Sequence, residues 1–205
     1  MLIFPIDALI AVFNVDTADD MAYRDNILER MKDGARYRLT TEAGTKLEFT
    51  ARHWILLDFE VCTAPVEETV EGKLVVDGAV FFRKNDMTTG EKIVVTVEHG
   101  KVTDIKAFDE QGEKLAEEYR NMIANAVKNP KNLQLAEVGI GFCNGATVSD
   151  CFMEAEIARE TCHCCFYKID EENNIEKILR LNKILLVLAR GSESVYMKKE
   201  GIKKE

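Results

Sequence analysis

Alternation between apolar and polar residues, interrupted by short turns, is the feature that most constrains how this chain can fold. An alternating run gives a strand one apolar face, and a turn signal between two such runs predicts a β-hairpin. Three segments show this pattern on both sides of a turn: residues 35–52 around Gly44, residues 70–83 around Gly78 and residues 92–108 around Gly100. We therefore expect antiparallel hairpins to dominate the fold.

Helical spacing occurs in a smaller part of the chain. Apolar residues recur at helical intervals over residues 17–34 and 109–127, and a short helix can begin at Ser149 or Asp150. The chain has three prolines and no low-complexity linker that would mark a domain boundary. We therefore predict a single domain over residues 1–205, of α+β class, with mainly antiparallel hairpins or a mixed sheet and two or three helices.

Charge and composition exclude several classes of partner. The 205 residues carry a net charge of −9, which argues against binding to nucleic acid or to an anionic membrane surface. The first residues lack the basic start and cleavage signal of a secretory peptide, and no apolar run approaches the ~20 residues of a membrane span. We therefore expect a cytoplasmic protein, in which its six cysteines are thiols or metal ligands rather than disulfides.

Three motifs, taken together and in this order, resemble a known family. They are FEVCTAPVEETVEGKLVVDGAV at residues 59–80, NLQLAEVGIGFCNGA at residues 132–146 and EAEIARETCHCCF at residues 154–166. They resemble the C-terminal metal-binding domain of the thermophilic metallo-aminopeptidases of the aminopeptidase T/S type. The likeness runs from about residue 39 to residue 196 and leaves residues 1–38 unassigned. The family enzymes carry a further N-terminal α/β domain, to which nothing in this sequence corresponds.

The resemblance implies a ligand set and an activity. Glu60, Glu137 and His163 occupy the positions of family metal ligands, and Glu156 is the nearest match to an acidic residue that would act as general base. The implied reaction is metal-dependent hydrolysis of the N-terminal bond of small peptides. The resemblance also implies a homodimer, or association with a partner subunit.

One departure from the family limits the metal content. The family has a His-x-Asp pair near its C-terminal hairpin, and Lys183 and Leu185 stand at those positions here. We therefore expect one divalent ion at most, zinc or cobalt. An ammonium group at Lys183 would either repel that ion or replace it by neutralising Glu60 and Glu137. Two functions stay open: a metal-dependent aminopeptidase-like hydrolase, and a non-catalytic relative that serves as a binding or assembly module.

The cysteines add candidate ligands. Four of the six lie between Cys151 and Cys165. Residues i and i+2 of a strand share a face, so Cys62 would lie beside Glu60, and Cys165 beside His163. Thiolates there would favour zinc or a softer ion, while the alternative is that they pack as small buried hydrophobes. The C-x-x-C unit that begins at Cys162 has no second pair and is a weak zinc or redox signal.

The other titratable residues have surface interpretations. Glu154, Glu156 and Glu160 fit a solvated helix face as well as a site. His53 and His99 fall in a predicted loop and a predicted turn, where a histidine is an ordinary surface residue.

Overall fold

Strands make up most of the protein, whose computed structural model describes residues 17–82, 92–127, 133–149, 151–168, 184–188 and 196–199. Eleven strands form one continuous sheet, and each pairing between them is antiparallel. The strands are β1 Arg36–Thr40, β2 Lys46–Leu57, β3 Glu60–Pro65, β4 Glu71–Val76, β5 Ala79–Phe82, β6 Ile93–Glu98, β7 Lys101–Ala107, β8 Leu133–Gly141, β9 Cys162–Lys168, β10 Ile184–Leu188 and β11 Tyr196–Lys199.

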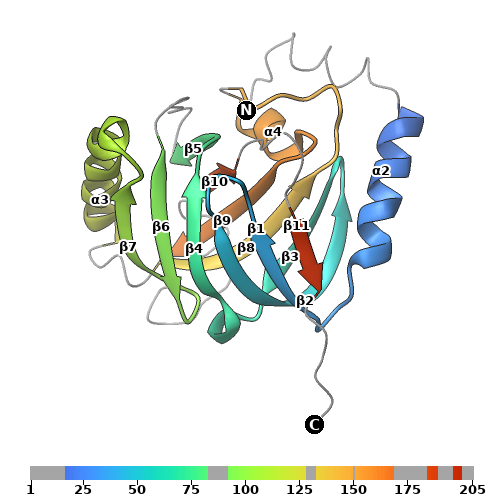
Figure 1. Ribbon diagram of the computed structural model, residues 1–205, viewed down its shortest axis with the longest axis horizontal. Helices are drawn as coiled ribbons and strands as arrows, with labels where there is room; N and C mark the ends of the chain where they lie inside the picture. The colour runs from blue at the N-terminus through green and yellow to red at the C-terminus, as the bar shows by residue number, and fades with distance from the viewer. Residues whose placement is uncertain are drawn as a thin grey trace.

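The sheet closes on itself, and this corrects the predicted fold class. Strand β3 pairs with β2 on one side and with β8 on the other. The path from β2 through β4, β6, β7 and β8 to β3 therefore returns to β2, and these six strands form a closed antiparallel barrel. The prediction of an α+β domain with a mixed sheet is wrong, because the molecule is mainly β (Figure 1).

Local pairing follows the alternation in two of the three segments. Strands β1 and β2 pair directly, and so do β6 and β7 across the turn at His99-Gly100. The expected hairpin at residues 70–83 is wrong: β4 pairs with β2 and β6, whereas β5 leaves its neighbour in sequence and pairs with β10. Alternation of apolar and polar residues predicts where a strand lies but not which strand it pairs with. The bend at Gly78 therefore has the same sequence pattern as a hairpin turn, although β4 and β5 do not pair.

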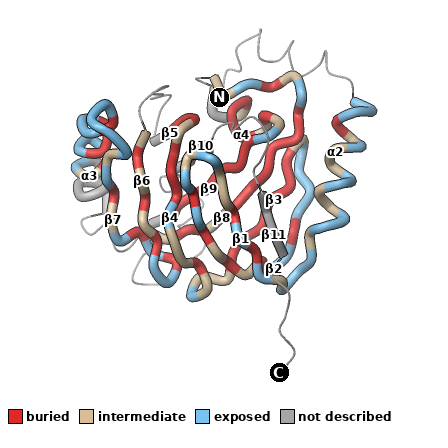
Figure 2. The backbone as a smooth tube through the Cα atoms, in the orientation of Figure 1, coloured by how far each residue is buried: buried red, intermediate tan, exposed pale blue. Residues whose placement is uncertain are grey.

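The apolar faces of the strands enclose the core. Buried side chains from β1, β2, β4, β6, β7 and β8 belong to one hydrophobic cluster (Figure 2). Within it, the ring of Tyr37 stacks on Phe49 with centroids 5.9 Å apart and meets the edge of Trp54 at 5.4 Å. This burial of large apolar surfaces is the main source of the barrel's stability.

Among the described residues, three α-helices lie outside the barrel: α2 Thr17–Arg30, α3 Glu113–Val127 and α4 Phe152–Ile157 (Figure 1). Helix α3 covers β6 and β7 with Leu115, Ala116 and Tyr119. Helix α2 is tied down through its first turn, where Arg159 binds both Asp19 and the fully buried Asp20. Asp20 also accepts a hydrogen bond from the Asn144 backbone. None of the helices in the described part of the chain combines the length and apolar character needed to cross a membrane.

Candidate metal centre

Three neighbouring strands, β3, β8 and β9, bring the predicted ligands onto one face. In the register, Cys62 lies opposite Gly139, and Gly139 lies opposite His163. Two residues further along the strands, in opposite directions, Glu60 pairs with Gly141, and Glu137 pairs with Cys165. Directly paired residues share a face, so these side chains project together. The alternate residues, such as Val61, Val138 and Cys164, belong to the hydrophobic core.

His163 is the centre of this face. Its ring is fully buried, and Nε2 lies 3.2 Å from Glu60 Oε2 and 3.4 Å from Glu137 Oε1. Its other nitrogen, Nδ1, lies 3.1 Å from the backbone oxygen of Glu156. A carbonyl oxygen only accepts hydrogen bonds, so Nδ1 carries the proton there, and Nε2 faces the two carboxylates. A bare lone pair would repel both anions, so a proton or a metal ion between Nε2 and the carboxylates would stabilise this arrangement.

The donor set fits a metal ion. Tetrahedral zinc holds nitrogen and oxygen ligands at about 2.0–2.1 Å, which places two ligand atoms about 3.3 Å apart. The separations of 3.2 Å and 3.4 Å at Nε2 match that spacing. They are longer than the usual N–H···O distance of about 2.9–3.0 Å. A backbone carbonyl on the far nitrogen is also the ordinary support for a metal-binding histidine.

Six residues supply the groups able to hold an ion. Their ligand atoms fall into three overlapping sets, within each of which the atoms lie within 4.8 Å of one another. The sets are Glu137, His163 and Cys165; Glu60, Glu156 and His163; and Glu60, Cys62 and Glu137. Each residue that the sequence analysis named as a candidate ligand or base belongs to at least one of these sets, although none of the three sets contains Glu60, Glu137 and His163 together.

Gly139 makes room for the His163 ring. A Cβ atom at this position would lie 2.2 Å from Nε2 and 2.3 Å from Cε1 of His163, closer than any side chain tolerates. The imidazole therefore lies directly over the backbone of β8, and the absence of a side chain at Gly139 sets its position. No feature of the sequence alone indicated this role.

We expect the substitution Gly139→Ala to weaken zinc binding by about tenfold or more, because the added methyl group displaces the imidazole from both carboxylates. Zinc affinity would be measured by chelator competition, with folding followed by circular dichroism. Gly34→Ala is the control for destabilisation alone: its φ of 71° makes an alanine strained, but a Cβ atom there meets nothing within 4 Å and touches no residue of the site. If a folded Gly139→Ala protein binds zinc with unchanged affinity, the absence of a side chain at Gly139 does not determine the position of the His163 ring.

The cysteine cluster divides between two environments. Cys62 and Cys165 lie on the face of the site, while Cys162 and Cys164 lie in the hydrophobic core. Cys162 and Cys165 therefore project from opposite faces of β9 and form no C-x-x-C unit. A hydrogen bond with Cys162, together with burial, raises the pKa of the Cys164 thiol, which keeps it protonated.

Helix α4 places two of its glutamates inside the protein. Glu154 is buried and accepts hydrogen bonds from the backbone and hydroxyl of Thr147 and from the hydroxyl of Ser149. Glu156 is 8% exposed and joins Glu60 and His163. The interpretation as a solvated helix face is wrong for both. Glu160 alone is exposed, just beyond the helix.

The remaining predicted positions lie elsewhere. His53 and His99 are surface residues paired with Asp33 and Glu71, although His53 belongs to β2 rather than to a loop. Leu185 pairs with Cys165 in the ladder between β9 and β10. Lys183 lies outside the described residues.

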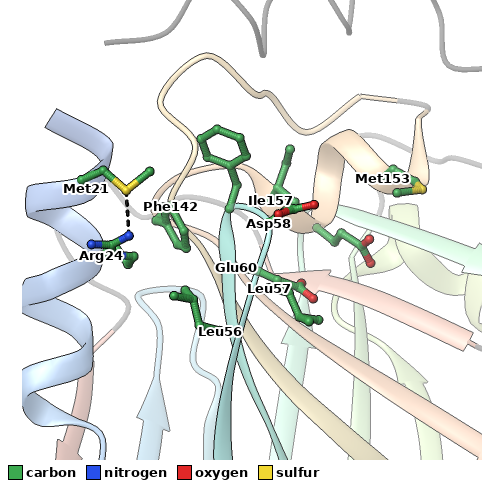
Figure 3. A pocket seen from close by; sticks show the side chains of 11 residues that line it. Met21, Arg24, Leu56, Leu57, Asp58, Glu60, Phe142, Met153 and Ile157 are labelled. Atoms are coloured by element: carbon green, nitrogen blue, oxygen red, sulfur yellow. Dashed lines mark hydrogen bonds between the residues drawn. The ribbon is translucent and has the colours of Figure 1, made fainter. Parts of the chain in front are cut away.

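A pocket of about 630 Å³ is lined by Glu60 and Glu156 from the site and by residues of α2 (Figure 3). The α2 residues are Met21 and Arg24, and Leu57 and Phe142 also line the pocket. The tight turn between β2 and β3 brings Asp58 to its rim, with Phe59 at a φ of 61°. No sequence pattern predicts this pocket, because the residues of α2 that line it are distant in sequence from the other lining residues.

Comparison with known proteins supports the fold. No protein-family model matches the chain, and no curated protein matches it. A structure of 2,5-dihydroxypyridine dioxygenase from Pseudomonas putida KT2440 is similar, with a TM-score of 0.66, 16% identity, and coverage of 90% of this chain and 57% of that chain. Wild-type AmpT from Thermus thermophilus, an aminopeptidase, is similar with a TM-score of 0.50, 17% identity, and coverage of 91% and 52%.

These two likenesses describe architecture. This chain spans little more than half the length of either protein. At 16% and 17% identity, the likenesses concern the fold alone. The dioxygenase shows that the same architecture occurs in a protein with a different reaction, so the fold alone does not select a chemistry.

Proposed function

We propose that this protein binds one divalent metal ion, zinc or cobalt, through Glu60, Glu137 and His163, and hydrolyses the N-terminal bond of small peptides. The observation that carries the proposal is the arrangement at His163. The Glu156 carbonyl holds the proton on Nδ1, and Nε2 is directed at two carboxylates at ligand-to-ligand spacing. A buried imidazole and two buried or half-buried carboxylates are a suitable donor set for a borderline cation.

The metal, when bound, polarises a carbonyl group and acidifies a water molecule. The chain's own contribution is then proton transfer. Glu156 lines both the site and the pocket, so its carboxylate can accept a proton from the attacking water. The water oxygen forms a bond to the carbonyl carbon, the C–N bond breaks, and Glu156 returns the proton to the leaving nitrogen. The products are a carboxylic acid and an amine, and no other reactant is needed.

Competing chemistries have less support. A mononuclear iron oxygenase commonly uses two histidines and one carboxylate. The chain has three histidines, and two of them, His53 and His99, lie at the surface in ion pairs away from the pocket. His163 is therefore the one imidazole in this face of the barrel. The donor set favours hydrolysis over oxygen chemistry, despite the likeness to the dioxygenase.

A non-catalytic role is the second candidate. The observation that favours it is that Nε2 of His163 lies 3.2 Å and 3.4 Å from the carboxylates of Glu60 and Glu137, so direct hydrogen bonding can hold the three side chains together without a metal. The protein would then keep the barrel and the pocket as a binding module.

Metal analysis separates the two candidates. The protein would be purified without added metal or chelator, assayed for bound metal, and then titrated with zinc and with cobalt. One tightly bound equivalent and release of amino acids from small peptides would support the hydrolase. Absence of metal, together with no affinity on titration, would overturn it in favour of the non-catalytic module.

The two thiols on the site face provide a further prediction. We propose that Cys62 and Cys165 contribute to ligation, and we expect the double variant Cys62→Ser/Cys165→Ser to bind zinc about tenfold more weakly or worse, because a hydroxyl is a poor substitute for a thiolate. Zinc titration of the two proteins measures the effect. The control is Cys143→Ser, outside the site in a separate apolar cluster. Wild-type zinc affinity in the double variant would assign both thiols to packing.

A further inference from the structure

Opposite charges line the two sides of the pocket. Asp58, Glu60 and Glu156 contribute carboxylates on the side of the metal centre. Arg24, on α2, is also among the lining residues, and its guanidinium lies beside the helix with a hydrogen bond to the Met21 sulfur (Figure 3). In the described part of the chain, Arg24 is the one basic residue in the lining. A ligand that spans the pocket would therefore meet negative charge at one end and positive charge at the other.

The present contacts of the Arg24 guanidinium group are weak enough for a ligand to replace them. Its Nη1 contacts the sulfur of Met21 at 2.8 Å, a weak acceptor, and its Nε and Nη2 bind a single oxygen of Asp25 at 2.8 Å and 2.6 Å. The Asp25 side chain is 60% exposed, and an exposed ion pair of this kind contributes little to stability. An incoming carboxylate can therefore exchange for this contact at little cost. A guanidinium group binds carboxylates in a two-pronged geometry that an amide cannot reproduce.

Apolar side chains also line the pocket. Leu57, Phe142, Met153 and Ile157 line the pocket, and the side of Leu57 is open to solvent, with the residue 49% exposed. An exposed leucine at the mouth of a pocket gains free energy when an apolar group covers it. The volume of about 630 Å³ lies within the range of about 300–1,000 Å³ that is usual for small-molecule sites.

We propose that the pocket selects short peptides with a free C-terminus: Arg24 binds the C-terminal carboxylate, the apolar residues cover an aliphatic side chain, and the α-ammonium end lies at the acidic side near the metal centre. This inference rests on the proposed peptide hydrolysis and deepens it. It makes Arg24 a specificity-determining residue and the enzyme one that prefers dipeptides to peptides blocked at the C-terminus.

The test compares Leu-Leu with its C-terminal amide, leucyl-leucinamide, on the zinc-loaded protein. We expect the KM for the amide to exceed that for the free dipeptide by about tenfold or more, because the charged carboxylate is lost. The substitution Arg24→Gln should remove the difference and leave zinc affinity unchanged. Arg30→Gln is the matched control, since Arg30 lies on the same helix, is exposed and is not among the pocket residues.

The outcomes distinguish this inference from the proposed function. If no hydrolysis occurs, the same pair of ligands is titrated by calorimetry. Binding that depends on the carboxylate and on Arg24 would then support the inference while overturning the hydrolase. Hydrolysis of both ligands with equal KM in wild-type protein would overturn the inference and leave the hydrolase intact. An equal loss of selectivity in Arg24→Gln and Arg30→Gln, or no binding at all, would also overturn it.

Discussion

The substitution His163→Gln should lower zinc affinity by more than about a hundredfold, since loss of a direct ligand exceeds the roughly 10- to 100-fold effect of losing a supporting group. Glutamine keeps much of the buried volume, and its amide can still donate hydrogen bonds to Glu60 and Glu137. It does not supply the imidazole lone pair that the metal requires. Zinc content after dialysis and affinity by chelator competition measure the effect.

Glutamine is preferable to alanine at this position for a structural reason. His163 is fully buried, and removal of its ring would leave a cavity beside two facing carboxylates. A protein that fails to fold would say nothing about metal binding. Folding is checked by the thermal transition, and His53→Gln provides the control, because the His53 side chain is 73% exposed and lies outside the metal-binding sets. If folded His163→Gln binds zinc with wild-type affinity, His163 is not a ligand and the proposed ligand set is wrong.

The sequence predicted strands and shared faces better than it predicted closure. Alternation on β3 and β9 is a local property, so the common face of Glu60 and Cys62, and of His163 and Cys165, follows from chain geometry alone. Closure depends on β3 pairing with both β2 and β8. The second of these partners is distant in sequence, and no local pattern encodes such a contact.

Within the site, too, local features could be predicted from the sequence, whereas features that depend on contacts between distant segments could not. The motifs named the candidate ligands, and the structure places each of them in at least one group of residues able to hold an ion. The motifs did not predict the burial of Glu154 and Glu156, since a short acidic helix has the composition of a solvated one. Burial of Glu154 depends on hydroxyl and backbone donors from Thr147 and Ser149. The position of Arg24 beside the pocket depends on α2, whose first turn is anchored by Arg159, a residue far along the chain.

The substitution Glu156→Gln should separate chemistry from metal binding. Loss of a general base lowers kcat by about 10²- to 10⁴-fold, and the amide keeps the size of the side chain. The backbone oxygen of Glu156, which holds His163 Nδ1, is unaffected by a change in the side chain. We therefore expect zinc affinity close to that of wild type, with peptide hydrolysis nearly abolished. Steady-state kinetics and zinc titration on the same preparation measure both quantities.

Glu160→Gln is the matched control, because Glu160 is exposed, lies four positions further along the chain and undergoes the same loss of charge. A general-base role requires kcat to fall in Glu156→Gln alone, with little change in KM. If zinc affinity falls together with kcat, Glu156 acts as a ligand, in keeping with its membership of a set with Glu60 and His163. If kcat is unchanged, the proton acceptor is another group, and among the carboxylates that line the pocket Asp58 then becomes the candidate, because Glu60 is already assigned to the metal.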